Sequence, residues 1–191
     1  MDPSVNYQGK LLIAQPKCES AFFKESIILV VKHSNNGAWG VMLNKPIPDK
    51  SCDLADIYNH IGMDNPTGVT APLYIGGPVE RSRVCIIHST DWASSSTIRV
   101  TEDVAVTTDI SVLAAISIGQ GPEKFRACCG ISSWAMGQLE GEMSGREPWN
   151  HLHKWLDTKA DAETVFDLEH TEQWSQLIVR AVRLEVGHWF S

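Results

Sequence analysis

A continuous apolar run followed by an Asn-Gly turn constrains the fold of this chain more than any other feature. Residues 26–33 read SIILVVKH, the β-branched and apolar pattern of a strand that is buried on both faces. The residues SNNG follow, and AWGVMLNKP after them reads as a second strand that Pro46 ends. Because an Asn-Gly turn typically joins neighbouring antiparallel strands, the sequence predicts a hairpin here.

Shorter elements follow this hairpin. Apolar residues at helical spacing between Asp53 and Gly62 predict a helix that Asp53 caps and Gly62 ends. Asp109 and Thr171 are placed to cap two more helices, and the one after Thr171 has the clearest apolar stripe. A further helix is expected over residues 136–143. Strands are expected over residues 73–75, 83–89 and 125–131, and over 98–106 either as two strands or as one kinked strand.

These elements predict an α+β fold. Strands outnumber helices in the first half, and the sequence has no internal repeat or obvious linker. We therefore expect one domain over residues 1–191, with a mixed, largely antiparallel sheet and flanking helices. A C-terminal helical extension is expected from about residue 149.

The charge and the chain start limit the partners and the compartment. The formal net charge of −7 repels polyanions, so direct nucleic-acid binding is disfavoured. The N-terminal apolar run, residues 11–14, is too short for a signal peptide or a membrane span. Five irregularly spaced cysteines are typical of reduced thiols. We expect a cytoplasmic protein without a membrane segment.

The stretch LYIGGPVERSR, residues 73–83, resembles a phosphate-binding turn but lacks its chemistry. Such a turn presents successive backbone N–H groups to an anion, and Pro78 has none. Gly76 and Gly77 are then explained by backbone dihedrals that other residues avoid. Two interpretations stay open: a simple chain reversal, or a rigid turn that positions Arg81 and Arg83 beside a site.

No catalytic or metal-binding constellation stands out. Cys85 and His88 are three residues apart on a strand, so they face opposite sides and cannot readily pair. His151 and His153 have no accompanying metal-ligand motif. We therefore expect neither metal nor cofactor, and the sequence favours a protein that is not an enzyme.

Recognition chemistry is concentrated in GISSWAMGQLEGEM, residues 130–143. A large aromatic, an amide and carboxylates can serve recognition as readily as acid–base chemistry, although a core tryptophan with a solvated acidic face explains them equally well. With the hairpin end and the glycine turn, this junction gives one candidate surface for a ligand or partner. Its residues are Asn44, Lys45, Gly76, Gly77, Arg81, Trp134, Gln138 and Glu140.

Five stretches in order resemble the AlgH/YqgE family of bacterial proteins. They are GKLLIAQP, FFKESIILVVKHSNNGAWGVMLNKP, LYIGGPV followed by HSTD, DISVLAAISIGQGPEKFRACCG, and SSWAMGQLEGEM, spanning about residues 9–143. The resemblance implies an α/β protein whose strands form a pseudo-barrel with helices around it. It implies a link to transcriptional regulation, with no established activity and no recognised DNA-binding motif.

The chain departs from the family pattern at Ile131 and Ser133, where an aromatic and a glycine are usual, and the stretch 145–161 looks longer than usual. A site shared by the family could be altered there.

Two functions follow as hypotheses. The first is a binding or regulatory protein that acts through a protein partner or a small ligand at the candidate surface. The alternative is a hydrolase-like enzyme for an anionic substrate, in which Lys45 or Arg81 binds the anion and Glu140 or His88 moves protons.

Overall fold

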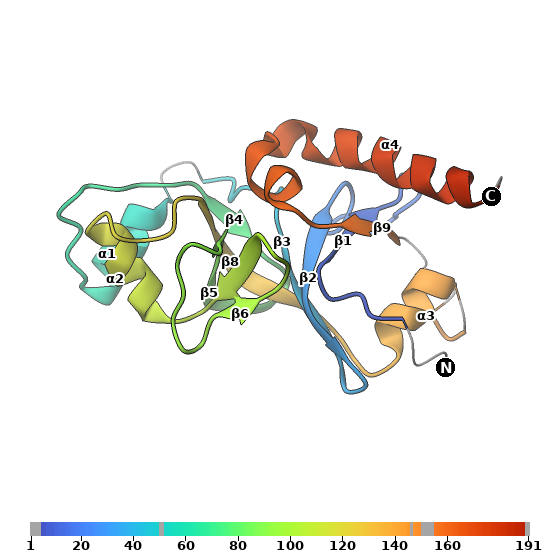
Figure 1. Cartoon of the computed structure of the whole chain (residues 1–191), viewed down its shortest axis with the longest axis horizontal. Helices are drawn as coiled ribbons and strands as arrows, with labels where there is room; N and C mark the ends of the chain where they lie inside the picture. The colour runs from blue at the N-terminus through green and yellow to red at the C-terminus, as the bar shows by residue number, and fades with distance from the viewer. Residues whose placement is uncertain (1–4, 50–51, 146, 150–154, 190–191) are drawn as a thin grey trace.

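The computed structural model describes residues 5–49, 52–145, 147–149 and 155–189 (Figure 1). Its strands are β1 (Lys10–Ala14), β2 (Ile27–Ser34), β3 (Gly37–Met42), β4 (Leu73–Ile75), β5 (Val79–Ser89), β6 (Ile98–Arg99), β7 (Val104–Thr107), β8 (Phe125–Trp134) and β9 (Trp155–Lys159). Its helices are α1 (Leu54–Ile61), α2 (Ile110–Ser117), α3 (Gln138–Ser144), the π-helical turn η2 (Glu163–Asp167) and α4 (His170–Trp189).

The strands form one curled sheet that the described residues leave open. Its order is β6-β7-β5-β8-β3-β2-β1-β9, and every pair in this path is antiparallel. β4 is parallel to the first half of β8, and β3 pairs with the second half of β8. The expected α+β class is therefore confirmed, with a curled sheet in place of a closed barrel.

Local sequence signals placed the hairpin and the first helices correctly. β2 and β3 pair with Ser34 opposite Gly37, and the first five residues of β2 are completely buried. α1 begins after an Asp53 capping box and ends at Gly62, which has a left-handed conformation. α2 begins after Asp109. Residues 98–106 contain two strands, β6 and β7, that pair with each other.

The core has three parts because both faces of the curled sheet are covered. The largest part fills the inside of the curl and includes Leu29 from β2, Val106 from β7 and Leu177 from α4. Helices α1 and α2 cover the outer face of β5 and β8, at the left in Figure 1. Helix α3 covers the outer face of β1, β2 and β3, at the lower right.

The C-terminal segment completes the sheet before it becomes helical. From about residue 149 the sequence suggests a helical extension, yet β9 pairs with all five residues of β1 as an edge strand. Helix α4 then runs across β1 and β9, at the top of Figure 1. Leu177 and Ala181 of α4 are buried against the inside of the curl, and Trp174 Nε1 donates to the carbonyl of Ala14 at 2.8 Å. The segment is thus an integral part of the fold.

Candidate functional site

Asn44 and Lys45 fasten the end of β3 to the loop before β2. Asn44 is buried, its Oδ1 accepts from the backbone N of Ile27 at 2.9 Å, and its Nδ2 donates to the carbonyl of Glu25 at 2.8 Å. The Nζ of Lys45 donates to the carbonyl of Lys24 at 2.7 Å. The polar groups of both side chains are therefore engaged by the backbone of this loop.

The glycine turn lies where β8 changes partner from β4 to β3. The Gly76 N donates to the carbonyl of Cys129 at 2.7 Å, and the Gly76 carbonyl accepts from the Met42 N at 2.8 Å. A Cβ on Gly77 would lie 2.1 Å from the backbone carbon of Ile131. The turn therefore needs glycine because two backbones pass very close, and the N–H of Gly76 is used within the sheet.

Arg81 lies in an irregular part of β5. The pairing of β5 with β8 shifts register between Val79 and Val84, and Arg81 is exposed within this stretch. Nearby, Arg83 pairs with Glu80 at 3.1 Å, and both side chains are about half exposed. Solvent screening leaves such a pair little effect on stability.

Trp134 and Gln138 meet at the carboxylate of Glu142. Glu142 is 3% exposed, and its Oε2 accepts from the indole nitrogens of Trp134 at 3.1 Å and Trp155 at 2.7 Å. Its Oε1 accepts from Gln138 Nε2 at 2.8 Å. Three N–H donors thus saturate this buried charge, and the cluster links α3 to β8 and β9.

Glu140 contacts a different residue, His33. Its Oε1 lies 3.2 Å from His33 Nε2, and the backbone N of Tyr7 donates to His33 Nδ1 at 3.2 Å. Because Nδ1 accepts a hydrogen bond, Nε2 carries the imidazole proton and donates to Glu140. The eight predicted residues therefore fall into several local groups of contacts, of which Trp134 and Gln138 share Glu142, and their role in binding stays a prediction.

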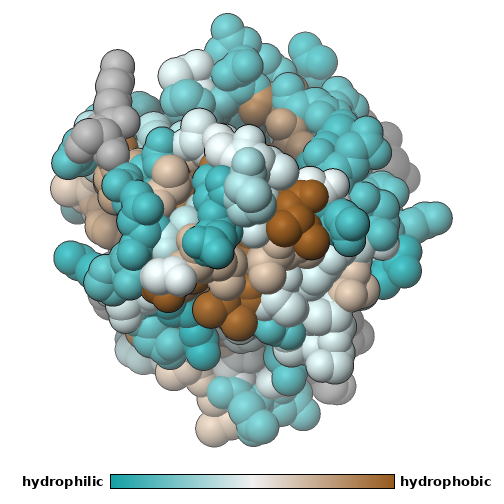
Figure 2. All heavy atoms as spheres, turned by 90° about the vertical axis from the view of Figure 1, so that its left-hand side faces the viewer, coloured by the Kyte–Doolittle hydropathy of each residue, from teal (hydrophilic) through white to brown (hydrophobic). Residues whose placement is uncertain are grey.

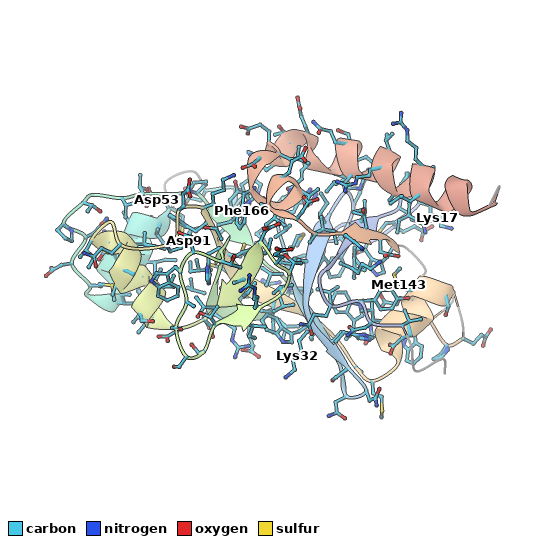
Figure 3. The ribbon with its side chains drawn as sticks, viewed as in Figure 1. Lys17, Lys32, Asp53, Asp91, Met143 and Phe166 are labelled. Carbon is cyan, nitrogen blue, oxygen red and sulfur yellow. The ribbon has the colours of Figure 1, made fainter. Side chains whose placement is uncertain are left out.

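A cavity of about 510 Å³ lies elsewhere, between the sheet and the segment that leads into α4. Its walls come from three distant parts of the chain and from Tyr74 of β4. Phe166 of η2, labelled in Figure 3, belongs to its wall. The lining is residues 69–72, Tyr74, residues 123–126 and residues 166–170. None of the eight predicted residues lines it.

Arg126 is the buried cation of this cavity. It shares a face of β8 with Cys128, which belongs to the core inside the curl, and the Arg126 side chain is only 8% exposed. Its Nη1 donates to the Leu43 carbonyl at 2.6 Å and to Gln173 Oε1 at 3.3 Å. Gln173 is itself fixed, since its Nε2 donates to the Thr164 carbonyl at 2.6 Å. The guanidinium is therefore held in one place.

Two nitrogens of Arg126, Nε and Nη2, have no hydrogen-bond acceptor among the described residues. Within the described ranges, neither Nε nor Nη2 donates to a protein acceptor, and no carboxylate lies within 4 Å of the guanidinium. Nε and Nη2 are also not fully buried, whereas His88 Nε2 is buried and has no hydrogen-bond partner. A guanidinium carries five N–H donors, so unused donors remain at the cavity.

Aromatic rings stand beside this guanidinium. The Arg126 Cζ lies 4.8 Å from the centroid of the Tyr74 ring, and the His170 ring meets Tyr74 edge-on at 6.0 Å. Burial raises the pKa of Tyr74, and the positive charge of Arg126 offsets part of that rise. The phenol therefore stays protonated at neutral pH, and its ring holds the cation by a cation–π contact.

The rim carries charges of both signs. Lys124 Nζ pairs with Asp167 Oδ1 at 2.6 Å, and Glu123 and Glu169 are exposed carboxylates. Counted with Arg126, the lining has two cations and three carboxylates. A small neutral or singly charged ligand meets little opposition here, while a polyanion meets three like charges.

A second cavity, of about 440 Å³, lies between α1 and α2 and is largely apolar. It belongs to the end of the molecule shown in Figure 2, where small apolar patches interrupt a mostly hydrophilic surface. Ile61 and Ile110 are partly exposed there. Its charged members are already engaged: Asp109 caps α2, and Arg83 pairs with Glu80. This groove is largely apolar, and its arginine is exposed to solvent, unlike the fixed and nearly buried Arg126.

His88 of the enzymatic alternative is buried, and so are Cys85 and Cys128. His88 is completely buried, its Nδ1 lies 2.8 Å from the Ser89 carbonyl, and burial lowers its pKa. Burial raises the pKa of Cys85 to about 12 and also raises that of Cys128. These thiols therefore carry almost no thiolate at neutral pH.

The described residues show neither a metal-binding cluster nor a helix that could span a membrane. In the described part of the chain, no three His, Cys, Asp or Glu residues gather in a way that could hold a metal ion. His151 and His153 lie outside the described residues. No described helix combines the length and the apolar character needed to cross a bilayer.

The family model described as AlgH-like matches residues 11–183. The chain belongs to the AlgH-like family. A UPF0301 protein of Thiobacillus denitrificans is 36% identical over 171 residues, covering 89% of this chain and 87% of that protein. A UPF0301 protein of Marinomonas sp. is 31% identical over 191 residues and covers 96% of each. The family resemblance expected from five motifs is confirmed, and the matched range extends through much of α4.

Two solved structures share the fold of this AlgH-like chain. The solution structure of AlgH from Pseudomonas aeruginosa has a TM-score of 0.73 and 29% identity, covering 94% of this chain and 91% of that one. A crystal structure from Corynebacterium diphtheriae has a TM-score of 0.67 and 22% identity, with 94% and 90% coverage. The fold is therefore common to distant relatives.

Sequence reasoning about this AlgH-like chain missed Arg126. One signal was available: an arginine inside the otherwise apolar strand FRACCG must be buried with partners or open to a cavity. The two family departures fall elsewhere on β8, with Ile131 buried and Ser133 exposed.

Proposed function

We propose that the chain is a cytoplasmic regulatory protein that binds a small molecule in the cavity at Arg126. The observation that carries the proposal is a fixed, nearly buried guanidinium with unused donors at a cavity of about 510 Å³. Cavities of this size suit small ligands, and a few placed polar groups within aromatic walls give them orientation. An effect on transcription would pass through this ligand or a partner protein, since a net charge of −7 disfavours contact with DNA.

Binding is favoured over catalysis by the state of the titratable groups. His88 is buried away from solvent, and Glu140 is engaged with His33. At the cavity itself, Lys124 is paired with Asp167, and Arg126 is held by the Leu43 carbonyl and by Gln173. The cavity therefore offers fixed donors and aromatic surface, which are means of recognition.

The test is a fragment screen read by amide chemical shifts on the full chain. A library with neutral, anionic and cationic members should contain compounds that shift the amides of residues 69–74, 123–126 and 166–173. In Ala71→Trp a bulky ring enters the cavity and should abolish these shifts. Ala114→Trp places the same ring on an exposed position of α2 and should leave them unchanged.

A library that leaves all cavity amides unmoved would overturn the proposal. So would shifts that persist unchanged in Ala71→Trp.

A further inference from the structure

We propose that the ligand is a small organic anion whose single carboxylate or phosphate ester binds Arg126 and whose flat apolar body lies against Tyr74 and Phe166. This inference rests on the proposed function and adds the chemical class of the ligand. Three features of the cavity support this ligand class: the unpaired charge of Arg126, the aromatic wall and the acidic rim.

The first feature is a buried cation without a counter-charge. Arg126 is 8% exposed, and no described carboxylate lies within 4 Å of it. Its present partners are the carbonyl of Leu43, the amide oxygen of Gln173 and the Tyr74 ring, all formally neutral. A buried charge is costly to the protein unless an opposite charge or good hydrogen bonds compensate it. An anion from solution would supply the missing charge.

The geometry of the guanidinium selects the kind of anion. Nη1 is anchored by two hydrogen bonds, which leaves Nε and Nη2 on one edge of the fork. This edge matches the two oxygens of a carboxylate or of a phosphate group. Since the side chain is already fixed, little conformational entropy is lost when the anion binds.

The wall next to Arg126 selects the body of the ligand. Tyr74, Phe166 and Leu168 line the cavity, and all three belong to the core inside the curl or pack against it. These side chains offer apolar area, and flat rings pack well against aromatic edges and faces. A bare inorganic anion would leave this surface uncovered, so we expect an organic anion to bind more tightly.

The rim limits the charge of the ligand. Glu123, Asp167 and Glu169 bring three carboxylates to the opening, and only Lys124 and Arg126 oppose them. A single negative charge at Arg126 is compensated locally. The additional charges of a nucleoside triphosphate would lie closer to the acidic rim and be repelled.

Calorimetric titration of the full chain with matched probes tests the inference. The probes are benzoate, phenyl phosphate, benzamide, inorganic phosphate and ATP. Benzoate or phenyl phosphate should bind at least tenfold more tightly than benzamide, inorganic phosphate and ATP, and the tighter of the first two identifies the anion. In Arg126→Gln this affinity should fall at least tenfold, while Arg183→Gln, which removes an exposed arginine outside the cavity, should change it less than twofold.

A measurement on the unchanged protein guards against a variant that does not fold. The Nε–H resonance of Arg126 should move on addition of benzoate and stay in place with benzamide. If benzamide binds the cavity as tightly as benzoate and phenyl phosphate, the anion inference is overturned and the proposed function survives. If no probe binds and the fragment screen is blank, both are overturned.

Discussion

Two buried charged residues, Glu142 and Arg126, differ in whether the protein pairs their hydrogen-bonding groups. Glu142 receives three N–H donors from Trp134, Trp155 and Gln138, so the protein satisfies it completely. Arg126 is nearly as buried, yet it has unused donors and no carboxylate partner among the described residues. A saturated buried charge stabilises a fold, whereas an unsaturated one at a cavity is a means of binding.

Glu142→Gln should therefore lower stability. An amide offers one acceptor oxygen where the carboxylate offers two, so its NH₂ group would face an N–H donor. The expected loss is about 1 to 3 kcal/mol in the free energy of unfolding, measured by urea denaturation. Glu102→Gln, on an exposed carboxylate, should change it by less than about 0.5 kcal/mol. Equal effects of the two substitutions would show that the cluster is unimportant.

His88 should make stability depend on pH. Burial lowers its pKa in the folded state, so below the unfolded pKa of about 6.5 the unfolded chain binds a proton that the native chain resists. The contribution of His88 is thus fully present above this pH and declines as the pH falls below it. Unfolding of His88→Leu from pH 8 to 5 should show a shallower decline than the wild type. His60→Gln, on an exposed histidine, should keep the wild-type slope.

At the scale of elements, the sequence correctly predicted the hairpin and the helix that are determined by residues close together in the chain. The β2–β3 hairpin follows from an apolar run and an Asn-Gly turn, and α1 follows from its Asp53 cap and Gly62. The sequence alone could not decide the role of the glycine turn, because its need for glycine comes from tertiary contacts. Gly76 and Gly77 press against β8, more than 50 residues later in the chain, and no local pattern announces that contact.

Gly77→Ala should be severely destabilising for this reason. The new Cβ would lie 2.1 Å from backbone atoms of Ile131, which cannot give way as a flexible side chain could. We expect a loss of more than about 3 kcal/mol, seen as a lower urea midpoint or a failure to fold. Gly68→Ala is the control: it has open space and a φ of +65°, so only about 1 kcal/mol of backbone strain is expected. A smaller effect at Gly77 than at Gly68 would contradict the close approach.

At the scale of the whole molecule, the cavity exists because distant segments converge. Its walls come from residues 69–74, residues 123–126 and the η2–α4 region, and Gln173 of α4 helps to hold Arg126. No residue of one segment indicates in the sequence that it will contact the other segments. The candidate surface was predicted from sequence motifs. The cavity instead depends on contacts between distant segments, which only the folded chain shows.

Docking of α4 should therefore control both stability and the cavity. Leu177 is 2% exposed inside the curl, so Leu177→Ala should cost about 2 to 5 kcal/mol in the free energy of unfolding and weaken benzoate binding. Val179→Ala, at a position of the same helix that is 48% exposed, should leave both nearly unchanged. Urea denaturation and calorimetric titration measure the two effects. Unchanged stability in Leu177→Ala would contradict the packing of α4.

The most direct test of anion binding at Arg126 is a crystal structure of the full chain with whichever of benzoate and phenyl phosphate binds more tightly. We expect the oxygens of its anionic group within hydrogen-bond distance, about 2.8 Å, of Nε and Nη2 of Arg126, with the ring beside Tyr74 and Phe166. A probe bound only at another place, or an Arg126 edge filled by a side chain of the protein itself, would contradict anion binding at this site.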